Sequence, residues 1–236
     1  MKDNTMPNSR WAFTADIADC FDDMLKRSIP YYANMRELIY AIGRNFVIPK
    51  TTIIDIGCSN GLNIAPFIEN FGANNRYALL DVSEPMLDKV RQKYDSYIKQ
   101  KIVDVYNMDV TKNLPNCSTS LIMSVLSLQF TPIEYRQSTI QRIHDLLLPN
   151  GAFIFVEKVI GDTDRIDRLF INEYYNLKSK NGYSQEAIDA KRKSLEFSLI
   201  PVKEKYNMDM LWQSGFKSVE CFWRALNFVG FIAIKS

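Results

Sequence analysis

Histidine is almost absent from this chain: His144 is the only one among 236 residues. Zinc hydrolases, histidine dyads and Ser-His-Asp triads all depend on histidine, so the sequence argues against these classes of enzyme. The four cysteines stand far apart, without the spacings that bind metals or exchange disulfides. We therefore predict free thiols, no metal site and a cytoplasmic location.

Long apolar runs and an excess of one charge are also missing. No apolar run approaches the roughly 20 residues that cross a membrane, and residues 1–10 are too polar for a secretory signal. The 29 basic and 27 acidic residues leave a net charge of +2. Proteins that bind the nucleic-acid backbone carry a clear basic excess. We expect neither membrane binding nor direct nucleic-acid binding.

The chain does have an ordinary globular composition, 47% hydrophobic and 24% charged. Short β-rich runs alternate with helical patterns, which is typical of βαβ units and a parallel sheet. The last two strand patterns, 219–223 and 228–235, are too close for a parallel crossover and predict an antiparallel hairpin. The other predicted elements are strands at 52–56, 77–82, 102–108, 120–125 and 152–156, and helices at 60–70, 85–96 and 133–148.

Two helical segments flank this core. Residues 21–46 precede the first strand, and residues 162–205, rich in lysine and tyrosine, separate the fifth strand from the hairpin. Insertions above the carboxyl ends of strands commonly form lids or substrate pockets, although a solvated helix is an alternative for most of these lysines. We expect one domain spanning residues 1–236, with an N-terminal helical cap at about 11–48 and a helical insert at about 162–205.

A glycine-rich turn follows the first strand. The sequence Ile53-Ile54-Asp55-Ile56-Gly57-Cys58-Ser59-Asn60-Gly61 takes a buried strand through a tight turn into a helix. Glycine there permits a sharp turn and close approach to a ligand. Asp81 ends the second strand, where a carboxylate can accept hydrogen bonds from both ribose hydroxyls. Asp109 ends the third strand, where its carboxylate can accept a hydrogen bond from the adenine amino group. Acids at three successive strand ends predict a nucleoside site at the carboxyl edge of the sheet.

Phosphate-binding motifs do not fit this turn. The third and sixth positions of Gly-x-Gly-x-x-Gly are Ser59 and Leu62, and the P-loop lysine is missing. S-adenosylmethionine has no phosphate but carries a sulfonium cation and a zwitterionic amino acid, so its site needs glycine turns and acids. The sequence favours this ligand, with NAD second. In a purely structural interpretation, Gly57 and Gly61 only form a turn and Asp81 caps a helix.

The pattern resembles class I S-adenosylmethionine-dependent methyltransferases, and the flanking segments resemble the narrower family of carboxy-S-adenosylmethionine synthases. The matching blocks follow the family's order with near-matching spacing, from about residue 11 to the end, and are more specific than the glycine turn. They are Trp11-Ala12-Phe13, Phe21-Asp22-Asp23-Met24, Arg27-Ser28-Ile29-Pro30-Tyr31-Tyr32-Ala33-Asn34, Leu128-Gln129-Phe130, Glu157-Lys158, Asn181-Gly182-Tyr183-Ser184, Lys191-Arg192 and Leu226-Asn227-Phe228.

The resemblance implies a Rossmann-like α/β fold with a seven-stranded, mostly parallel sheet, an antiparallel last strand and a homodimer. It implies an enzyme that converts S-adenosylmethionine and prephenate into carboxy-S-adenosylmethionine and phenylpyruvate. A partner enzyme then uses the product to modify the wobble uridine of tRNA. By position, the cofactor contacts would be Tyr32, Gly57, Cys58, Ser59, Asp81, Val82, Asp109 and Val110.

Arg192 falls where the family places the arginine that holds the new carboxylate. A planar guanidinium can grip a carboxylate through two parallel hydrogen bonds, which a lysine cannot copy. The resemblance therefore implies a role for Arg192 in both cofactor binding and catalysis. Taken without the resemblance, Arg192 is one more cation on a solvated helix.

Three positions depart from the family's pattern. Val125 replaces an asparagine after the fourth strand and removes one polar contact to the ligand, which Ser124 or Ser127 can replace if it points the right way. Phe197 replaces a second asparagine, and Tyr31 stands where a small residue can occur. Because these changes surround the expected substrate pocket, two alternatives stay open: a methyltransferase acting on a small molecule, and a non-catalytic S-adenosylmethionine-binding subunit.

Other reactive or aromatic residues receive no catalytic role. His144 lies beside Asp145 on a predicted helix, which indicates a structural or surface position. Nothing near Cys58 clearly activates its thiol. Tyr174 and Tyr183 can line a substrate pocket, although aromatic residues in a helical insert more often serve packing.

Overall fold

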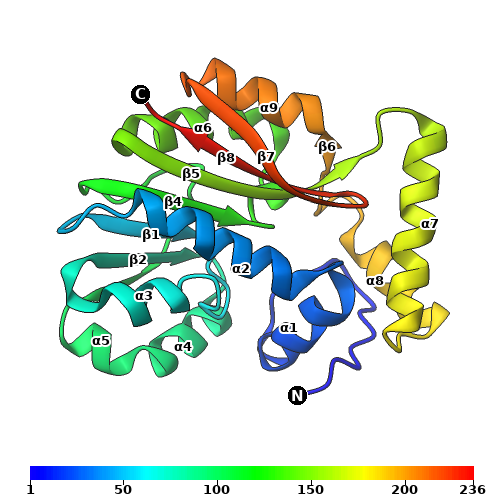
Figure 1. The fold of residues 1–236 in the computed structure, drawn as a ribbon. Helices are drawn as coiled ribbons and strands as arrows, with labels where there is room; N and C mark the ends of the chain where they lie inside the picture. Colours follow the sequence, from blue (N-terminus) through cyan, green and yellow to red (C-terminus); the bar gives the residue numbers. More distant parts are fainter.

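The computed structural model describes residues 1–236 and centres on one mixed sheet. Its strands are β1 (Thr52–Ile56), β2 (Arg76–Asp81), β3 (Val103–Asn107), β4 (Thr119–Val125), β5 (Leu147–Ile160), β6 (Val202–Lys203), β7 (Ser218–Ala225) and β8 (Phe228–Ile234). The order is β3-β2-β1-β4-β5-β8-β7, with β6 beside the end of β5 (Figure 1). Strands β1 to β5 run parallel, and β8 is antiparallel to both β5 and β7. The parallel core and the hairpin are as predicted, and β6 is an additional strand.

Helices cover both faces of the sheet. They are α1 (Ala15–Ser28), α2 (Tyr32–Gly43), α3 (Ala65–Phe71), α4 (Glu84–Lys93), α5 (Asp95–Lys99), α6 (Ile133–Leu146), α7 (Asp164–Lys180), α8 (Gln185–Leu195) and α9 (Glu204–Gln213). Successive strand residues point to opposite faces, so Ile53 packs in the core with α2 and α3 while Ile54 packs with α6 and α9. Every residue of β1 and β4 is buried, as expected for strands covered on both sides.

Several predicted boundaries were wrong. The helix expected at 85–96 is divided into α4 and α5, and the one expected at 133–148 ends at Leu146. The helix expected at 60–70 begins only at Ala65, because the turn before it holds Gly57, Ser59 and Gly61 at positive φ. Strand β5 begins at Leu147 rather than Ala152 and includes Pro149. The register with β4 shifts there, so the four residues between Leu147 and Ala152 have no partner in β4. Proline fits at such an irregularity because it has no ladder hydrogen bond to lose.

The N-terminal segment and the helical insert lie side by side although they are far apart in the sequence (Figure 1). The predicted N-terminal helical segment is two helices, α1 and α2, since Pro30 precludes one continuous helix. The backbone N–H of Trp11 donates to the carbonyl of Ser194 at the end of α8, over 2.8 Å. This hydrogen bond joins the N-terminal segment to the helical insert.

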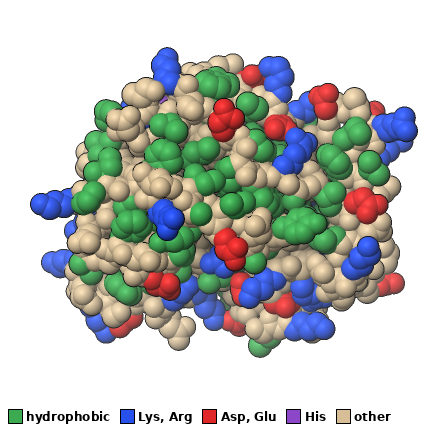
Figure 2. Space-filling view, viewed as in Figure 1, with side chains coloured by type: hydrophobic (Ala, Val, Ile, Leu, Met, Phe, Trp, Pro, Cys, Tyr) green, Lys and Arg blue, Asp and Glu red, His purple; other side chains and the backbone are tan.

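The visible surface carries both signs of charge. In Figure 2, Lys and Arg side chains are interspersed with Asp and Glu, without a continuous basic patch on this face. Among the helices, none combines the length and the hydrophobicity that crossing a membrane requires.

Candidate active site

A cavity of about 660 Å³ opens at the carboxyl ends of β1, β2 and β4. Small-molecule sites commonly span about 300–1,000 Å³. Its walls come from these strand ends, from α1, α2, α7 and α8, and from the N-terminal segment. The two helical segments that flank the core therefore cover the sheet edge that is expected to bind a nucleoside.

The glycine turn after β1 forms one wall of the cavity. Gly57 and Gly61 have φ of 64° and 70°, in the left-handed region that favours glycine. A Cβ on Gly57 would lie 1.9 Å from the Oγ of Ser127, and one on Gly61 would lie 2.8 Å from the ring of Tyr94. Both positions thus require glycine for space as well as for conformation. The turn brings backbone close to any ligand at this end.

Backbone donors hold the first of the two predicted acids. Asp81 accepts hydrogen bonds from the backbone N–H groups of Ser59 and Ser83, each 2.9 Å long, which tie β2 to the glycine turn. Burial raises the pKa of Asp81, and these hydrogen bonds oppose the rise. Each carboxylate oxygen retains a further lone pair for a ligand donor. Asp81 is therefore positioned as an acceptor at the cavity wall.

The second acid, Asp109, sits in a tight turn of its own. It accepts from the backbone N–H of Thr111 at 3.0 Å and from its hydroxyl at 2.7 Å. The Thr111 hydroxyl is the main cause that holds the pKa of Asp109 below its usual value. Asp109 is thus an ionised acceptor on the same cavity as Asp81.

Apart from Arg192, the residues predicted to contact the cofactor all line this cavity, and their contact with the cofactor stays a prediction. Tyr32 is 4% exposed, and burial raises the pKa of its phenol to about 12, so it is a neutral group. Burial also raises the pKa of the Cys58 thiol, which makes it a poor nucleophile. The cavity-lining set is Tyr32, Gly57, Cys58, Ser59, Asp81, Val82, Asp109 and Val110.

Arg192 is the one predicted site residue that does not line the cavity of its own chain. Its side chain is 52% exposed and pairs with Asp189 and Glu196 of the same helical region. Its neighbour Lys191 lines the cavity instead, because successive residues of a helix point in different directions. Phe197, just beyond, is 87% exposed at φ 60°, a conformation that asparagine adopts more readily than phenylalanine.

Val125, the substituted position, is the last residue of β4, and the structure shows which serine lies near it on the cavity wall. Val125 lines the cavity with no polar atom to offer. Ser127 lines it as well, whereas the hydroxyl of Ser124 is buried without a partner and does not line it. Of the two serines, Ser127 is the one placed to replace the missing amide.

Asp55 was part of the motif but not among the predicted site residues. Its side chain is fully buried, and neither carboxylate oxygen has a hydrogen-bond partner. Burial, followed by the charge of Asp81, raises the pKa of Asp55 to about 8. The signal in the sequence was an acid between isoleucines in a buried strand, because a carboxylate is costly to bury there without a function.

Sequence reasoning also missed two lysines at the other end of the cavity. Lys158 on β5 and Lys178 on α7 line it, with Nζ atoms 4.8 and 5.4 Å from the ring centroid of Tyr174. Burial lowers the pKa of each lysine to about 8. Tyr174 therefore lines the cavity as well as packing on Phe228, while Tyr183 lies outside it.

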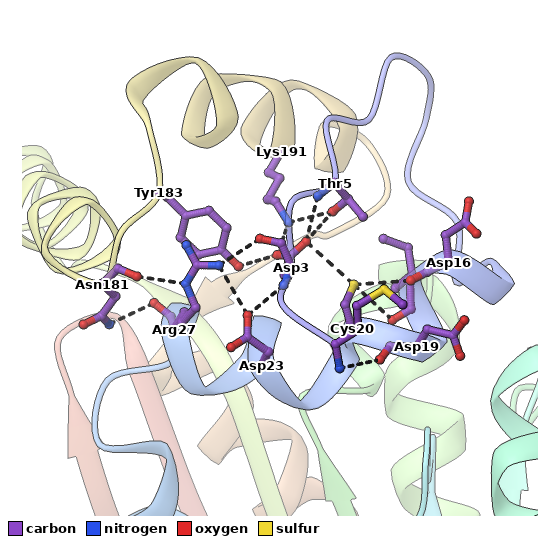
Figure 3. A network of polar contacts seen from close by, with 12 residues as sticks. Asp3, Thr5, Asp16, Asp19, Cys20, Asp23, Arg27, Asn181, Tyr183 and Lys191 are labelled. Atoms are coloured by element: carbon purple, nitrogen blue, oxygen red, sulfur yellow. Dashed lines mark hydrogen bonds and ion pairs between the residues drawn. The ribbon is translucent and has the colours of Figure 1, made fainter.

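The N-terminal segment is anchored behind this second end by a polar network (Figure 3). The buried carboxylate of Asp3 accepts from Lys191, Tyr183 and Thr5. Burial works to raise the pKa of Asp3, but these donors, led by Lys191, outweigh it and lower the pKa to about 2. Lys191 is thus neutralised by an acid from the opposite end of the chain.

Comparisons with known proteins agree with this architecture. Residues 54–153 match the family described as methyltransferase domain. The chain is similar to carboxy-S-adenosyl-L-methionine synthases from three bacteria. It is 36% identical to that of Methylococcus capsulatus, over 95% of this chain and 93% of the relative. It is 36% identical to that of Wolinella succinogenes (96% and 94% covered) and 32% identical to that of Trichodesmium erythraeum (100% and 94% covered).

Solved structures share the fold at low sequence identity. An O-methyltransferase family protein from Burkholderia thailandensis aligns with a TM-score of 0.64 at 15% identity, covering 94% of this chain and 60% of that one. Human N-acetylserotonin methyltransferase, in complex with S-adenosylmethionine, aligns with a TM-score of 0.61 at 14% identity, covering 93% and 55%. The chain thus spans little more than half the length of these structures, and the likeness shows the fold alone.

The site and the comparisons lead to one assignment. The fold is that of class I S-adenosylmethionine-dependent methyltransferases, and the chain is an S-adenosylmethionine-dependent transferase that acts on a small molecule. Given full-length relatives at up to 36% identity, the chain belongs to the family of carboxy-S-adenosyl-L-methionine synthases.

Proposed function

We propose that this protein makes carboxy-S-adenosylmethionine from S-adenosylmethionine and prephenate. S-adenosylmethionine supplies the methyl carbon that receives the carboxylate. Prephenate loses one carboxylate and its ring hydroxyl as the ring becomes aromatic, which leaves phenylpyruvate. The proton lost from the methyl group and the departing hydroxide together make water, so atoms and charge balance.

The observation that carries this proposal is the opposite character of the two ends of one cavity. Asp81 and Asp109, at the sheet edge, suit the hydroxyl and amino donors of an adenosyl group. Lys158 and Lys178, at the far end, suit a carboxylated co-substrate. A methyltransferase acting on a neutral acceptor gains nothing from lysines that are shielded from water and have no partner, and such shielding is costly. Val125 favours that second function, because it removes a polar contact expected in the synthases.

We further propose a homodimer in which Arg192 of one protomer completes the cavity of the other. What supports this is that Arg192 is exposed and does not line its own cavity, while its helix forms part of the wall. Phe197, 87% exposed on the same segment, is an aromatic side chain suited to burial against a second copy. The guanidinium would then hold the new carboxylate through two parallel hydrogen bonds.

We also propose that the whole chain acts as one domain in the cytoplasm. Its product would pass to a partner enzyme that modifies the wobble uridine of tRNA. The net charge of +2 and the mixed charges of the face in Figure 2 support an enzyme that does not itself hold tRNA.

Mass spectrometry of the nucleoside released when freshly purified protein is denatured tests the proposal first. A ligand heavier than S-adenosylmethionine by one carbon dioxide unit supports it. Incubation with S-adenosylmethionine and prephenate should then yield equal amounts of carboxy-S-adenosylmethionine and phenylpyruvate, with no product when prephenate is omitted. Protein that binds S-adenosylmethionine yet makes no carboxylated product would contradict the proposal and favour a methyltransferase.

A further inference from the structure

The far end of the cavity contains two lysines, Lys178 buried and Lys158 partly buried, whose charges nothing in the chain neutralises. Lys158 comes from β5 and Lys178 from α7, and Lys178 is only 5% exposed. No hydrogen bond or ion pair involves either ammonium group in the structure, in which fifteen other ion pairs form. Buried ammonium groups are ordinarily paired, since desolvating an unpaired charge is costly.

The acids closest to these lysines are already engaged. Asp3 is bound by Lys191, Tyr183 and Thr5. Asp167 acts on Lys158 only through its charge, and its carboxylate accepts the backbone N–H of Gly161 at 2.7 Å. The region therefore keeps two positive charges that the protein leaves without a direct partner.

The aromatic ring of Tyr174 lies near both ammonium groups without neutralising them. Its centroid is 4.8 Å from the Nζ of Lys158 and 5.4 Å from that of Lys178. A cation–π contact of this kind offsets part of the desolvation of an ammonium group but adds no negative charge. The ring thus fixes the two lysines on one side of the cavity while their charges stay available to a ligand.

A third lysine shows the contrast. Lys191 also lines the cavity, but its ammonium group is paired with Asp3 and also donates to the hydroxyl of Thr5 at 2.9 Å. Of three lysines at this end, one is neutralised internally and two are not. Two unpaired charges match a ligand with two negative charges.

We propose that Lys158 and Lys178 together bind the carboxylates of a dianionic organic acid, the second substrate of this enzyme. The inference rests on the proposed function in so far as that acid is prephenate, and it adds the residues that select it. Desolvated ammonium groups attract a dianion more strongly than a monoanion. The site should therefore prefer prephenate to phenylpyruvate, which has lost one carboxylate, and so help product release.

A direct measurement of prephenate binding tests this proposal independently of whether the enzyme makes carboxylated product. Prephenate is titrated by calorimetry into protein saturated with S-adenosylhomocysteine, which has no transferable methyl group and cannot react. We expect wild-type protein to bind prephenate more tightly than phenylpyruvate. The Lys158→Met and Lys178→Met variants should each raise the Kd for prephenate by roughly 10- to 100-fold, the range for losing a charged hydrogen-bond partner. Their affinity for S-adenosylhomocysteine should stay within about twofold of wild type, since its expected contacts lie at the other end.

Lys180→Met is the matched control, because Lys180 lies on the same helix, two residues away, and is exposed. It should bind prephenate as wild type does. If a methionine variant also binds S-adenosylhomocysteine more weakly, the corresponding glutamine variant, Lys158→Gln or Lys178→Gln, is used in its place. Glutamine keeps a polar end group but carries no charge. A rise in Kd in these variants supports the proposal.

Unchanged prephenate affinity in variants that still bind S-adenosylhomocysteine would overturn the proposal, as would wild-type protein that does not bind prephenate. Turnover is scored separately. Lysine-dependent prephenate binding without carboxylated product would leave the dianion site standing and remove the proposed function. Carboxylated product from wild type, with lysine variants that bind prephenate normally, would remove only the dianion site.

Discussion

The two ends of the cavity are built in different ways. At the sheet edge, Asp81 and Asp109 are held by hydrogen bonds from turns beside their own strands or the next one. At the far end, Lys158 and Lys178 come from separate elements and have no polar partner. The first end is preorganised before a ligand arrives, whereas the second holds charges that only a ligand can neutralise. The comparison suggests that local structure binds the nucleoside and tertiary packing selects the co-substrate.

The largest effect should come from filling the preorganised end. Gly57→Ala places a Cβ where it would lie 1.9 Å from the Oγ of Ser127, at a positive φ. Overpacking costs about 1–3 kcal/mol, so the Kd for S-adenosylmethionine, measured by calorimetry, should rise by about 5- to 150-fold. Gly72→Ala is the control, since Gly72 has φ 50° but nothing within 4 Å of the added Cβ. Equal affinity in the two variants would show that the turn is not a ligand wall.

The Arg192→Leu variant tests whether this arginine takes part in the reaction at the end of the cavity that contains Lys158 and Lys178. Arg192→Leu should lower kcat/KM for carboxylation by roughly 10- to 100-fold, the loss expected for a charge-assisted contact. Lys193→Leu, an exposed neighbour, should leave it unchanged. Undiminished carboxylated product from Arg192→Leu would remove this role.

Subunit mixing then locates the arginine. At subsaturating S-adenosylmethionine, the Arg192→Leu and Gly57→Ala variants are each expected to keep at most about a tenth of wild-type activity when alone. Randomly mixed dimers should regain about a quarter of wild-type activity per chain, because half are mixed and each contains one complete site. No recovery, in subunits shown to exchange, would place Arg192 in its own site.

The pH dependence should distinguish the two ends. Burial lowers the pKa of Lys158 and of Lys178 to about 8, so both are charged below that pH and lose charge above it. The kcat/KM for prephenate should therefore fall by up to about tenfold per lysine for each pH unit above 8. Asp55, whose pKa burial raises to about 8, gains charge over the same range. The Lys158→Met and Lys178→Met variants separate the two causes of this fall in kcat/KM, because they lose only the lysine contribution. If kcat/KM falls above pH 8 as steeply in these variants as in wild type, the fall is due to Asp55.

The smallest effect concerns the missing asparagine. Ser127→Ala should weaken S-adenosylmethionine binding about fivefold, the value of one hydrogen bond of about 1 kcal/mol. Ser124→Ala is its control, because that hydroxyl is buried without a partner and nothing is lost on removing it. Equal affinities in a binding titration would show that Ser127 does not take over the role of the amide.

Much of the fold follows from local signals. The bounds of β1 agree with the prediction because an isoleucine-rich run ends at a glycine turn. The acids at the strand ends lie together because parallel strands bring their carboxyl ends to one edge. The start of β5 was missed because its irregular pairing depends on β4 and on the chain's last residues, not on the apolar pattern of β5 itself.

The sequence does not predict which lysines of α7 are buried and which are exposed. Lys178 and Lys180 stand two apart in one helix and look alike in the sequence, yet the first is buried and the second exposed. The side of α7 that faces the cavity is set by Tyr174 packing against Phe228, with ring centroids 5.5 Å apart. That contact joins residues more than fifty positions apart, which no local pattern records.

By itself the sequence determined the alternating strands and helices, the glycine turn, the acids at the strand ends and the resemblance to a family. Each of these depends on neighbouring residues or on the regular geometry of a parallel sheet. Only the tertiary structure decided that Asp3 neutralises Lys191, that Lys158 and Lys178 stay unpaired, and that Arg192 does not line its own cavity. Burial and charge pairing depend on contacts between distant segments, so they arise only when the chain has packed.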